Sequence, residues 1–307
     1  MTNRLFITAL CATTAACATA SRTEPPENYR YGVLVLAHGG SPEWNEAVRD
    51  AVRGLEDDDD VEIAFGMADA KTIQEGVRRL EERGVQRIGV VRLFVSGESW
   101  YERTEQILGL APGAPPKPAA EVEDHSQHGA HSMEFWRIET AASFALSTEG
   151  LAGEFSMGEI LAERASDLSR SPATEDVLIL AHGPGDDEEN ERWLADMEVL
   201  AGAVRSARPF RRVEAMTLRE DWPEKREVSE QRIRDYVARA KAEGGSAIVV
   251  PFRVHGFGPY AAVLEGLDYA ADGRGLLPHA LVGSWIKRQA RTIERGPFRE
   301  PIQVRGR

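Results

Sequence analysis

Cysteine is almost absent from this chain of 307 residues, which has only Cys11 and Cys17. The remaining chain therefore has no disulfide, no thiolate metal site and no cysteine nucleophile. The chain also has no long apolar run, since the apolar run near the N-terminus is too short to span a bilayer. The formal net charge of −13 excludes a broad cationic surface for nucleic acid. No G-x-G-x-x-G, Walker lysine or G-x-S-x-G occurs, so neither a nucleotide site nor a serine hydrolase is expected.

The first thirty residues read differently from the rest. The segment 1–30 contains an early arginine, a short apolar run, small residues and a Pro/Glu-rich linker, which is the layout of an export signal. Cys17 follows Thr14-Ala15-Ala16 in a sequence similar to a bacterial lipobox, and its lipidation would anchor the N-terminus to a membrane. The alternative is soluble secretion after cleavage behind Ala20. We expect an exported, periplasmic protein, anchored as a lipoprotein through Cys17.

One phrase occurs twice in the chain. "VLVLAHGG" begins at Val33 and "VLILAHGP" begins at Val177, and each apolar run stops on Ala-His-Gly at His38 or His182. Strands and helices alternate after each phrase, which predicts two similar doubly wound α/β lobes with parallel sheets. Ligands of such sheets bind beyond the carboxyl ends of the strands, where both histidines fall, and we expect the ligand cleft between the lobes. The predicted elements are strands at 32–37, 61–67, 87–95, 177–181, 212–218 and 246–254, and helices near 42–55, 70–84, 187–206 and 223–243.

These elements divide the chain into five parts. They are the signal and linker (1–30), lobe one (31–111), an insertion (112–150), a lobe-closing helix with lobe two (151–286), and a basic, solvated tail (287–307). The insertion is rich in proline and alanine and then carries three closely spaced histidines, His125, His128 and His131. Such a cluster suits an auxiliary metal-binding loop, but a surface loop can also carry histidines without binding anything.

The third strand of each lobe adds a further histidine. "VRLFVSGESWYE" from Val91 and "VPFRVHGFGPYA" from Val250 align without gaps, so that Ser96 matches His255. His255 would then lie at the same sheet edge as His182. Two neutral imidazoles suit a borderline divalent ion such as Co²⁺, Ni²⁺ or Zn²⁺, and one of them is also suited to accept a proton.

These phrases resemble the class II chelatases, in particular the sirohydrochlorin cobaltochelatases of the CbiX/SirB kind. The resemblance spans about 32–110 and 140–286 and implies metal insertion into a tetrapyrrole, with His38 and His182 as catalytic and metal-binding residues. It departs from the family at the second histidine, which aligns near Trp100 and Pro259. The expected metal ligands are therefore His182 with His255 in lobe two, and His38 with Glu98 in lobe one.

The implied substrates are a divalent metal ion, by resemblance Co²⁺ with Ni²⁺, Fe²⁺ or Zn²⁺ as alternatives, and a sirohydrochlorin-type ring. No nucleotide is needed. Arg92 and Arg253 interrupt apolar strand ends and are expected to bind the ring carboxylates, although an ion pair at the sheet edge would explain them equally well. The proton acceptors considered are Glu98, Glu188 and Glu189. A non-catalytic exported lipoprotein that binds a metal or a tetrapyrrole is the alternative function.

Overall fold

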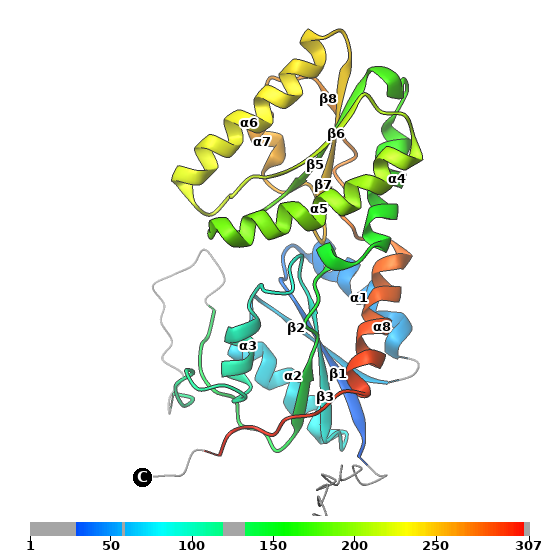
Figure 1. The fold of residues 1–307 in the computed structure, drawn as a ribbon. Coiled ribbons are helices and arrows are strands. Elements are labelled where there is room, and N and C mark those ends of the chain that lie inside the picture. Colours follow the sequence, from blue (N-terminus) through cyan, green and yellow to red (C-terminus); the bar gives the residue numbers. More distant parts are fainter. Residues whose placement is uncertain (1–28, 57–58, 119–132, 304–307) are drawn as a thin grey trace, which may run out of the picture.

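The computed structural model describes residues 29–56, 59–118 and 133–303. They form two α/β lobes, each built on a four-stranded parallel sheet (Figure 1). The strand orders are β2-β1-β3-β4 and β6-β5-β7-β8, so the two sheets have the same topology and confirm the expected doubly wound lobes. The strands are β1 (Tyr31–Ala37), β2 (Asp60–Phe65), β3 (Arg87–Leu93), β4 (Ser143–Leu146), β5 (Glu175–Ala181), β6 (Arg212–Thr217), β7 (Ser246–Phe252) and β8 (Tyr269–Ala270).

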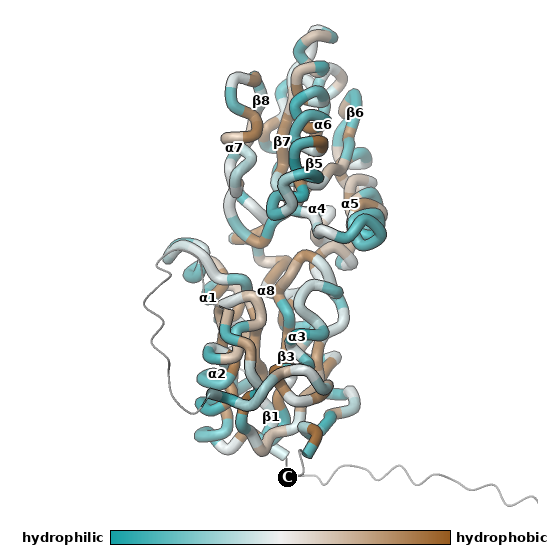
Figure 2. Tube along the Cα trace, turned by 90° about the vertical axis from the view of Figure 1, so that its left-hand side faces the viewer, coloured by the Kyte–Doolittle hydropathy of each residue, from teal (hydrophilic) through white to brown (hydrophobic). Residues whose placement is uncertain are grey.

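Helices cover both faces of each sheet. Their inward faces are apolar: on α2, for example, Ile73, Val77 and Leu80 recur at helical spacing and are buried. Figure 2 shows the central strands as largely hydrophobic and the outer helix α6 as largely hydrophilic. The α-helices are α1 (Pro42–Glu56), α2 (Ala70–Glu82), α3 (Tyr101–Ile107), α4 (Ser156–Leu168), α5 (Asp187–Ala207), α6 (Pro223–Ala242), α7 (Tyr260–Val263) and α8 (Ala280–Glu294).

The lobes exchange helices. Helix α4 follows the last strand of lobe one but packs on α5 of lobe two, whereas α8 follows the last strand of lobe two but packs on α1 and β3 of lobe one (Figure 1). One apolar cluster therefore runs from Val33 and Val48, through Ile160 and Trp285 on the exchanged helices, to Ile179. This shared core joins the two lobes.

Two expected boundaries differ from the structure. The segment 112–150 is not wholly an insertion, because it contains β4, which pairs with β3. The expected tail at 287–307 begins inside α8, which is buried on lobe one at Ala290 and Ile293. Beyond α8 the chain pairs with β4, since Arg299 and Phe144 exchange two backbone hydrogen bonds. The basic residues of this segment are thus attached to a packed element.

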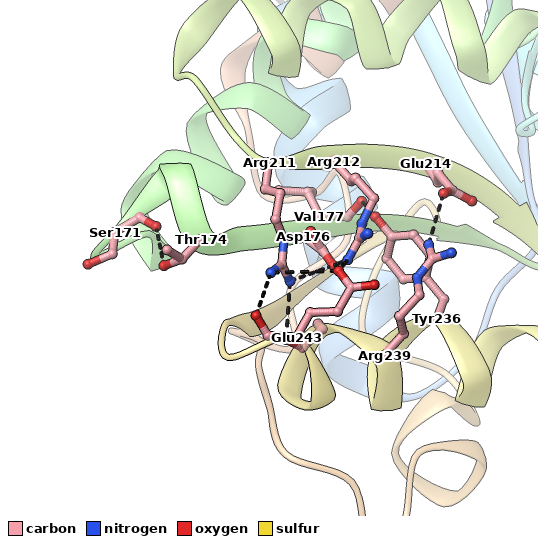
Figure 3. A network of polar contacts seen from close by, with 11 residues as sticks. Ser171, Thr174, Asp176, Val177, Arg211, Arg212, Glu214, Tyr236, Arg239 and Glu243 are labelled. Carbon is pink, nitrogen blue, oxygen red and sulfur yellow. Dashed lines mark hydrogen bonds and ion pairs between the residues drawn. The ribbon is translucent and has the colours of Figure 1, made fainter.

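A buried ion-pair network closes the amino-terminal end of the lobe two strands (Figure 3). Asp176, at the start of β5, is fully buried and accepts hydrogen bonds from Arg211 at 2.8 and 2.9 Å and from Arg212. Arg212 also binds Glu243 at the end of α6. His182 follows the other end of β5, so this network supports the lobe and lies away from the site described next.

Candidate metal centre at the strand ends of lobe two

The repeated Ala-His-Gly phrase fixes a histidine ring in each lobe. His182 Nδ1 lies 2.6 Å from the carbonyl oxygen of Gly183, and His38 Nδ1 lies 2.8 Å from that of Gly39. A carbonyl only accepts, so Nδ1 carries a hydrogen in both rings and donates it. Both glycines have a positive φ, 77° and 79°, which is the left-handed region that favours glycine. The duplicated phrase therefore leaves Nε2 of each histidine to face outward.

His182 Nε2 faces two carboxylates from the loop after β6. It lies 2.9 Å from Asp221 Oδ2 and 3.6 Å from Glu220 Oε1. Among the described residues these three form the one group of at least three His, Cys, Asp or Glu side chains whose ligand atoms all lie within 4.8 Å of one another. With Nδ1 protonated, a neutral ring would direct its Nε2 lone pair at two oxygen acceptors. A cation between the three groups would satisfy this arrangement of one nitrogen lone pair and two carboxylates.

Arg219 holds the loop that presents these carboxylates. It adopts a positive φ of 57°, its backbone N–H donates to the His182 carbonyl at 2.7 Å, and its buried guanidinium donates to the carbonyls of Pro184 and Gly185. The β6–α6 loop is thereby tied to the β5–α5 loop. Trp222 packs against the β5–α5 loop, where a Cβ on Gly185 would lie only 2.2 Å from its ring. The Trp222 ring also stands edge-on to the His182 ring, with 6.0 Å between the ring centroids.

Glu220 is further held by Arg253. Its Oε2 accepts from Arg253 Nη1 at 2.8 Å, and its side chain is only 14% exposed. Arg253 was expected to bind a ring carboxylate, and in the structure it binds a carboxylate of the protein itself. The ion-pair alternative thus describes its contact. Asp221, by contrast, is 67% exposed and is the most accessible of the three groups.

His255, the expected partner of His182, does not belong to this group. It lies past the end of β7, where it forms a bridge with Leu277 and lines a cavity of about 820 Å³ together with Glu43, Asn45 and other residues at the beginning of α1. Burial lowers the pKa of His255, although the nearby Glu43 acts in the opposite direction. His255 thus faces lobe one, because the chain turns towards the other lobe after β7.

Glu98, the expected ligand beside His38, is bound across the lobes. Its two carboxylate oxygens accept from Nε and Nη2 of Arg192 on α5, both at 2.7 Å. This hydrogen bonding with Arg192 lowers the pKa of Glu98. In the part of the chain that the structure describes, no group of three ligand side chains forms around His38. His38 instead lies near the ring of Trp44, at 6.2 Å.

Arg92 differs from the expectation as well. It is fully buried in lobe one, lies over the ring of Tyr101 at 4.6 Å, and donates to the Gly97 carbonyl at 2.9 Å. Burial lowers the pKa of Arg92 to about 10. Its guanidinium is therefore a structural donor and is not presented to a ligand.

The two further acids lie on the first turn of α5. Glu188 is exposed, whereas Glu189 is partly buried and accepts a hydrogen bond from Trp193 at 3.3 Å. Burial raises the pKa of Glu189, the charges of Glu98 and Asp186 add to the rise, and the Trp193 bond opposes it. Cys17, His125, His128 and His131 lie outside the described residues. No helix among the described residues is long and apolar enough to cross a membrane.

Sequence reasoning missed Glu220 and Asp221. Neither acid belongs to the phrases that the two lobes share, and an acid pair at this position occurs only in lobe two. The available signal was position, since the acids lie three and four residues after β6, whose carboxyl end lies beside that of β5. Two acids at the carboxyl end of a neighbouring strand would have been expected beside His182.

Comparisons with known proteins find structures with a similar fold and a family model that matches part of the sequence. The CbiX family model matches residues 32–131. SirB from Bacillus subtilis with Fe³⁺ is 14% identical, with a TM-score of 0.57 over 87% of this chain and 96% of that one. The sirohydrochlorin chelatase SirB from Bacillus subtilis subspecies spizizenii, in complex with cobalt, is 13% identical, with a TM-score of 0.55 over 86% and 96%.

DR2241 from Deinococcus radiodurans, a multi-domain protein with structural similarity to chelatases, is 19% identical with a TM-score of 0.52. The match covers 86% of this chain but only 55% of that protein. No curated protein sequence matches the chain. Residues 32–131 thus match the CbiX family model, and the two lobes together have a fold similar to that of the SirB structures and DR2241, as the resemblance implied.

Proposed function

We propose that this protein binds a divalent metal ion at His182, Glu220 and Asp221 and transfers it to a tetrapyrrole of the sirohydrochlorin type. The observation that carries the proposal is the convergence of two carboxylates on a histidine nitrogen whose ring already donates from its other nitrogen. One imidazole and two carboxylates form a mixed N/O donor set, which suits first-row divalent ions. The SirB structures with Fe³⁺ and with cobalt support a metal ion as the substrate of this protein, which has a similar fold.

The three groups have different parts in the transfer. His182 is a neutral ligand in its bound state, so it releases the ion without leaving an extra negative charge behind. Asp221 is the most exposed of the three and is therefore the ligand that exchanges first for a ring nitrogen. Each ligand that the ion leaves becomes a free base, and two such bases are needed for the two pyrrole N–H protons.

The ring is proposed to bind between the lobes. The cavity of about 820 Å³ beside α1, with His255 and Pro278 on its other side, has the size of an ordinary small-molecule site, but His182, Glu220 and Asp221 are not among its lining residues, so the ring would have to extend from it to reach the metal. Residues of both lobes line it, so a bound macrocycle would contact both. Cobalt is the proposed ion by resemblance to the sirohydrochlorin cobaltochelatases.

The proposed place of action rests on the N-terminal segment. An export signal with Cys17 as its lipidation site supports a periplasmic, membrane-anchored protein. Tetrapyrrole metallation of this type is expected in the cytoplasm, so turnover has to be tested directly. An exported carrier would bind the same two ligands without joining them.

The deciding experiment mixes the purified protein, without residues 1–20, with Co²⁺ and sirohydrochlorin and follows the absorbance of the ring. Insertion faster than the spontaneous reaction, and lost in the His182→Ala variant, is the expected result. Spectral binding of the ring without acceleration would support the carrier and contradict the enzyme. The Lys241→Gln variant, which removes an ion pair between two exposed side chains, Lys241 and Asp268, is the matched control and is expected to behave as the wild type.

A further inference from the structure

We infer that Arg253 is a positioning residue of this site, which acts on the metal through Glu220; the inference rests on the proposed function. Arg253 Nη1 donates to Glu220 Oε2 at 2.8 Å, while the other oxygen, Oε1, is the one that lies 3.6 Å from His182 Nε2. The guanidinium thus occupies one oxygen of the carboxylate and turns the second towards the histidine. An ionised carboxylate with one oxygen engaged is a one-oxygen ligand of fixed direction.

The surroundings of Arg253 hold it in that position. Its guanidinium lies over the ring of the fully buried Tyr260, 5.5 Å from the ring centroid. On another side it is covered by Gly258, where a Cβ would lie only 2.7 Å from Arg253 Cζ. Gly258 has a φ of 63°, so it suits this position both by its lack of a side chain and by its backbone. Arg253 is therefore built into the lobe and is not a flexible surface cation.

Lobe one has a comparable arginine without this function. In the gap-free alignment of the two third strands, Tyr101 matches Tyr260, and each tyrosine has an arginine over its ring. The arginines come from different strand positions, and Arg92 donates to the Gly97 carbonyl where Arg253 donates to a carboxylate. The packing of an arginine on this tyrosine is thus shared by the lobes. The contact with an acid facing the strand-end histidine belongs to lobe two.

Removing the arginine is expected to free Glu220 to rotate away from His182. Loss of a group that orients a metal ligand typically lowers metal affinity by about 10- to 100-fold. We expect Arg253→Gln to weaken Co²⁺ binding by about tenfold in calorimetric titration and to change the visible absorption of bound Co²⁺. Arg253→Lys, which keeps the charge near Glu220, is expected to recover most of both.

A double-mutant cycle separates this role from a general effect on the fold. In the Glu220→Gln background, Arg253→Gln is expected to change the Co²⁺ affinity by less than about twofold, because the group through which it acts is gone. An equal loss in both backgrounds, unchanged affinity or tighter binding would each overturn the positioning role. If Arg253→Gln does not fold, Arg253→Met, which keeps an unbranched side chain beside Tyr260 but has no donor, supplies the cycle in the same two backgrounds.

The same titrations distinguish the two proposals. If His182→Ala loses Co²⁺ binding but Arg253→Gln does not, the positioning role is overturned and the proposed function stands. If His182→Ala binds Co²⁺ as the wild type does, the proposed metal site itself is overturned. Lys241→Gln, which removes an exposed ion pair with Asp268 in the same lobe, is the control and is expected to leave the titration unchanged.

Discussion

His182 and Asp221 meet from the carboxyl ends of neighbouring strands, with 2.9 Å between Nε2 and Oδ2. Their contact distinguishes two lobes that otherwise share one topology. In lobe one the residues three and four positions after β2 are Ala68 and Asp69, where lobe two has Glu220 and Asp221 after β6. Asp69 is used to build the lobe, because it accepts from the backbone N–H groups of Thr72 and Glu134. The corresponding acids of lobe two are left to face the histidine.

Removing either carboxylate is expected to weaken metal binding without unfolding the protein. Asp221→Asn should raise the Kd for Co²⁺ by about tenfold, since the amide keeps the shape of the side chain but loses its charge. Glu220→Gln should have a similar effect and should also leave Arg253 unpaired, so that its Tm falls further than that of Asp221→Asn. Calorimetric titration and thermal unfolding of the two variants measure both effects. A wild-type Kd in both would contradict the assigned ligand set.

Glu98 is expected to matter little for the metal, because Arg192 already occupies both of its oxygens. Glu98→Gln should leave the Kd for Co²⁺ within about twofold of the wild type. The free energy of unfolding should fall by less than about 1 kcal/mol, since both partners are half exposed and such pairs contribute little. Titration and denaturant unfolding check the two values. A tenfold loss of Co²⁺ affinity would restore Glu98 as a ligand.

The buried network at Asp176 is expected to make the stability of the protein depend on acid. Burial acts to raise the pKa of Asp176, but the hydrogen bonds and charges of Arg211 and Arg212 outweigh it and lower that pKa. Its contribution is therefore complete above the unfolded-state pKa and is lost as the pH falls through the folded-state value. Asp176→Asn should cost about 3–5 kcal/mol at neutral pH and less in acid, since it breaks a buried pair. Urea unfolding of both proteins between neutral and acidic pH measures this, and a pH-independent difference would contradict it.

The N-terminal segment gives a prediction about location. The full chain should fractionate with membranes, and Cys17→Ser should release it into the soluble periplasmic fraction, because the lipid is attached through that thiol. Ser21→Ala, a nearby change outside the lipobox-like sequence, is the control and should remain with the membrane. A soluble wild type would leave secretion without an anchor.

The sequence predicted the strands and helices that the two lobes share, but it did not predict β4 or the position of α8. The strands after which His38 and His182 lie are continuous apolar runs of the kind that buried parallel strands require, and they were predicted within two residues. The short β4 was missed because a strand of four residues is too short to give a periodic signal. The place of α8 on lobe one was missed because exchange of helices depends on packing between lobes, which no local pattern records.

His182 lies at the sheet edge where the sequence placed it, and the side chains that face it are Glu220 and Asp221, whereas His255 was expected. The sequence correctly indicated that His38 and His182 directly follow the carboxyl ends of β1 and β5. It could not indicate that the chain after β7 turns His255 towards Glu43, or that Arg219 ties the loop carrying Glu220 against His182. These outcomes depend on loop geometry, which is set by contacts distant in sequence.

The most direct measurement is a calorimetric titration of Co²⁺ into the His182→Ala and His38→Ala variants. His182→Ala should weaken binding by at least about tenfold, on the order of 1.4 kcal/mol, because it removes the one nitrogen ligand of the group. His38→Ala should do distinctly less, since the described part of lobe one gathers no carboxylates around that ring. Equal or reversed losses would place the site in lobe one or between the lobes and would contradict the assignment to lobe two.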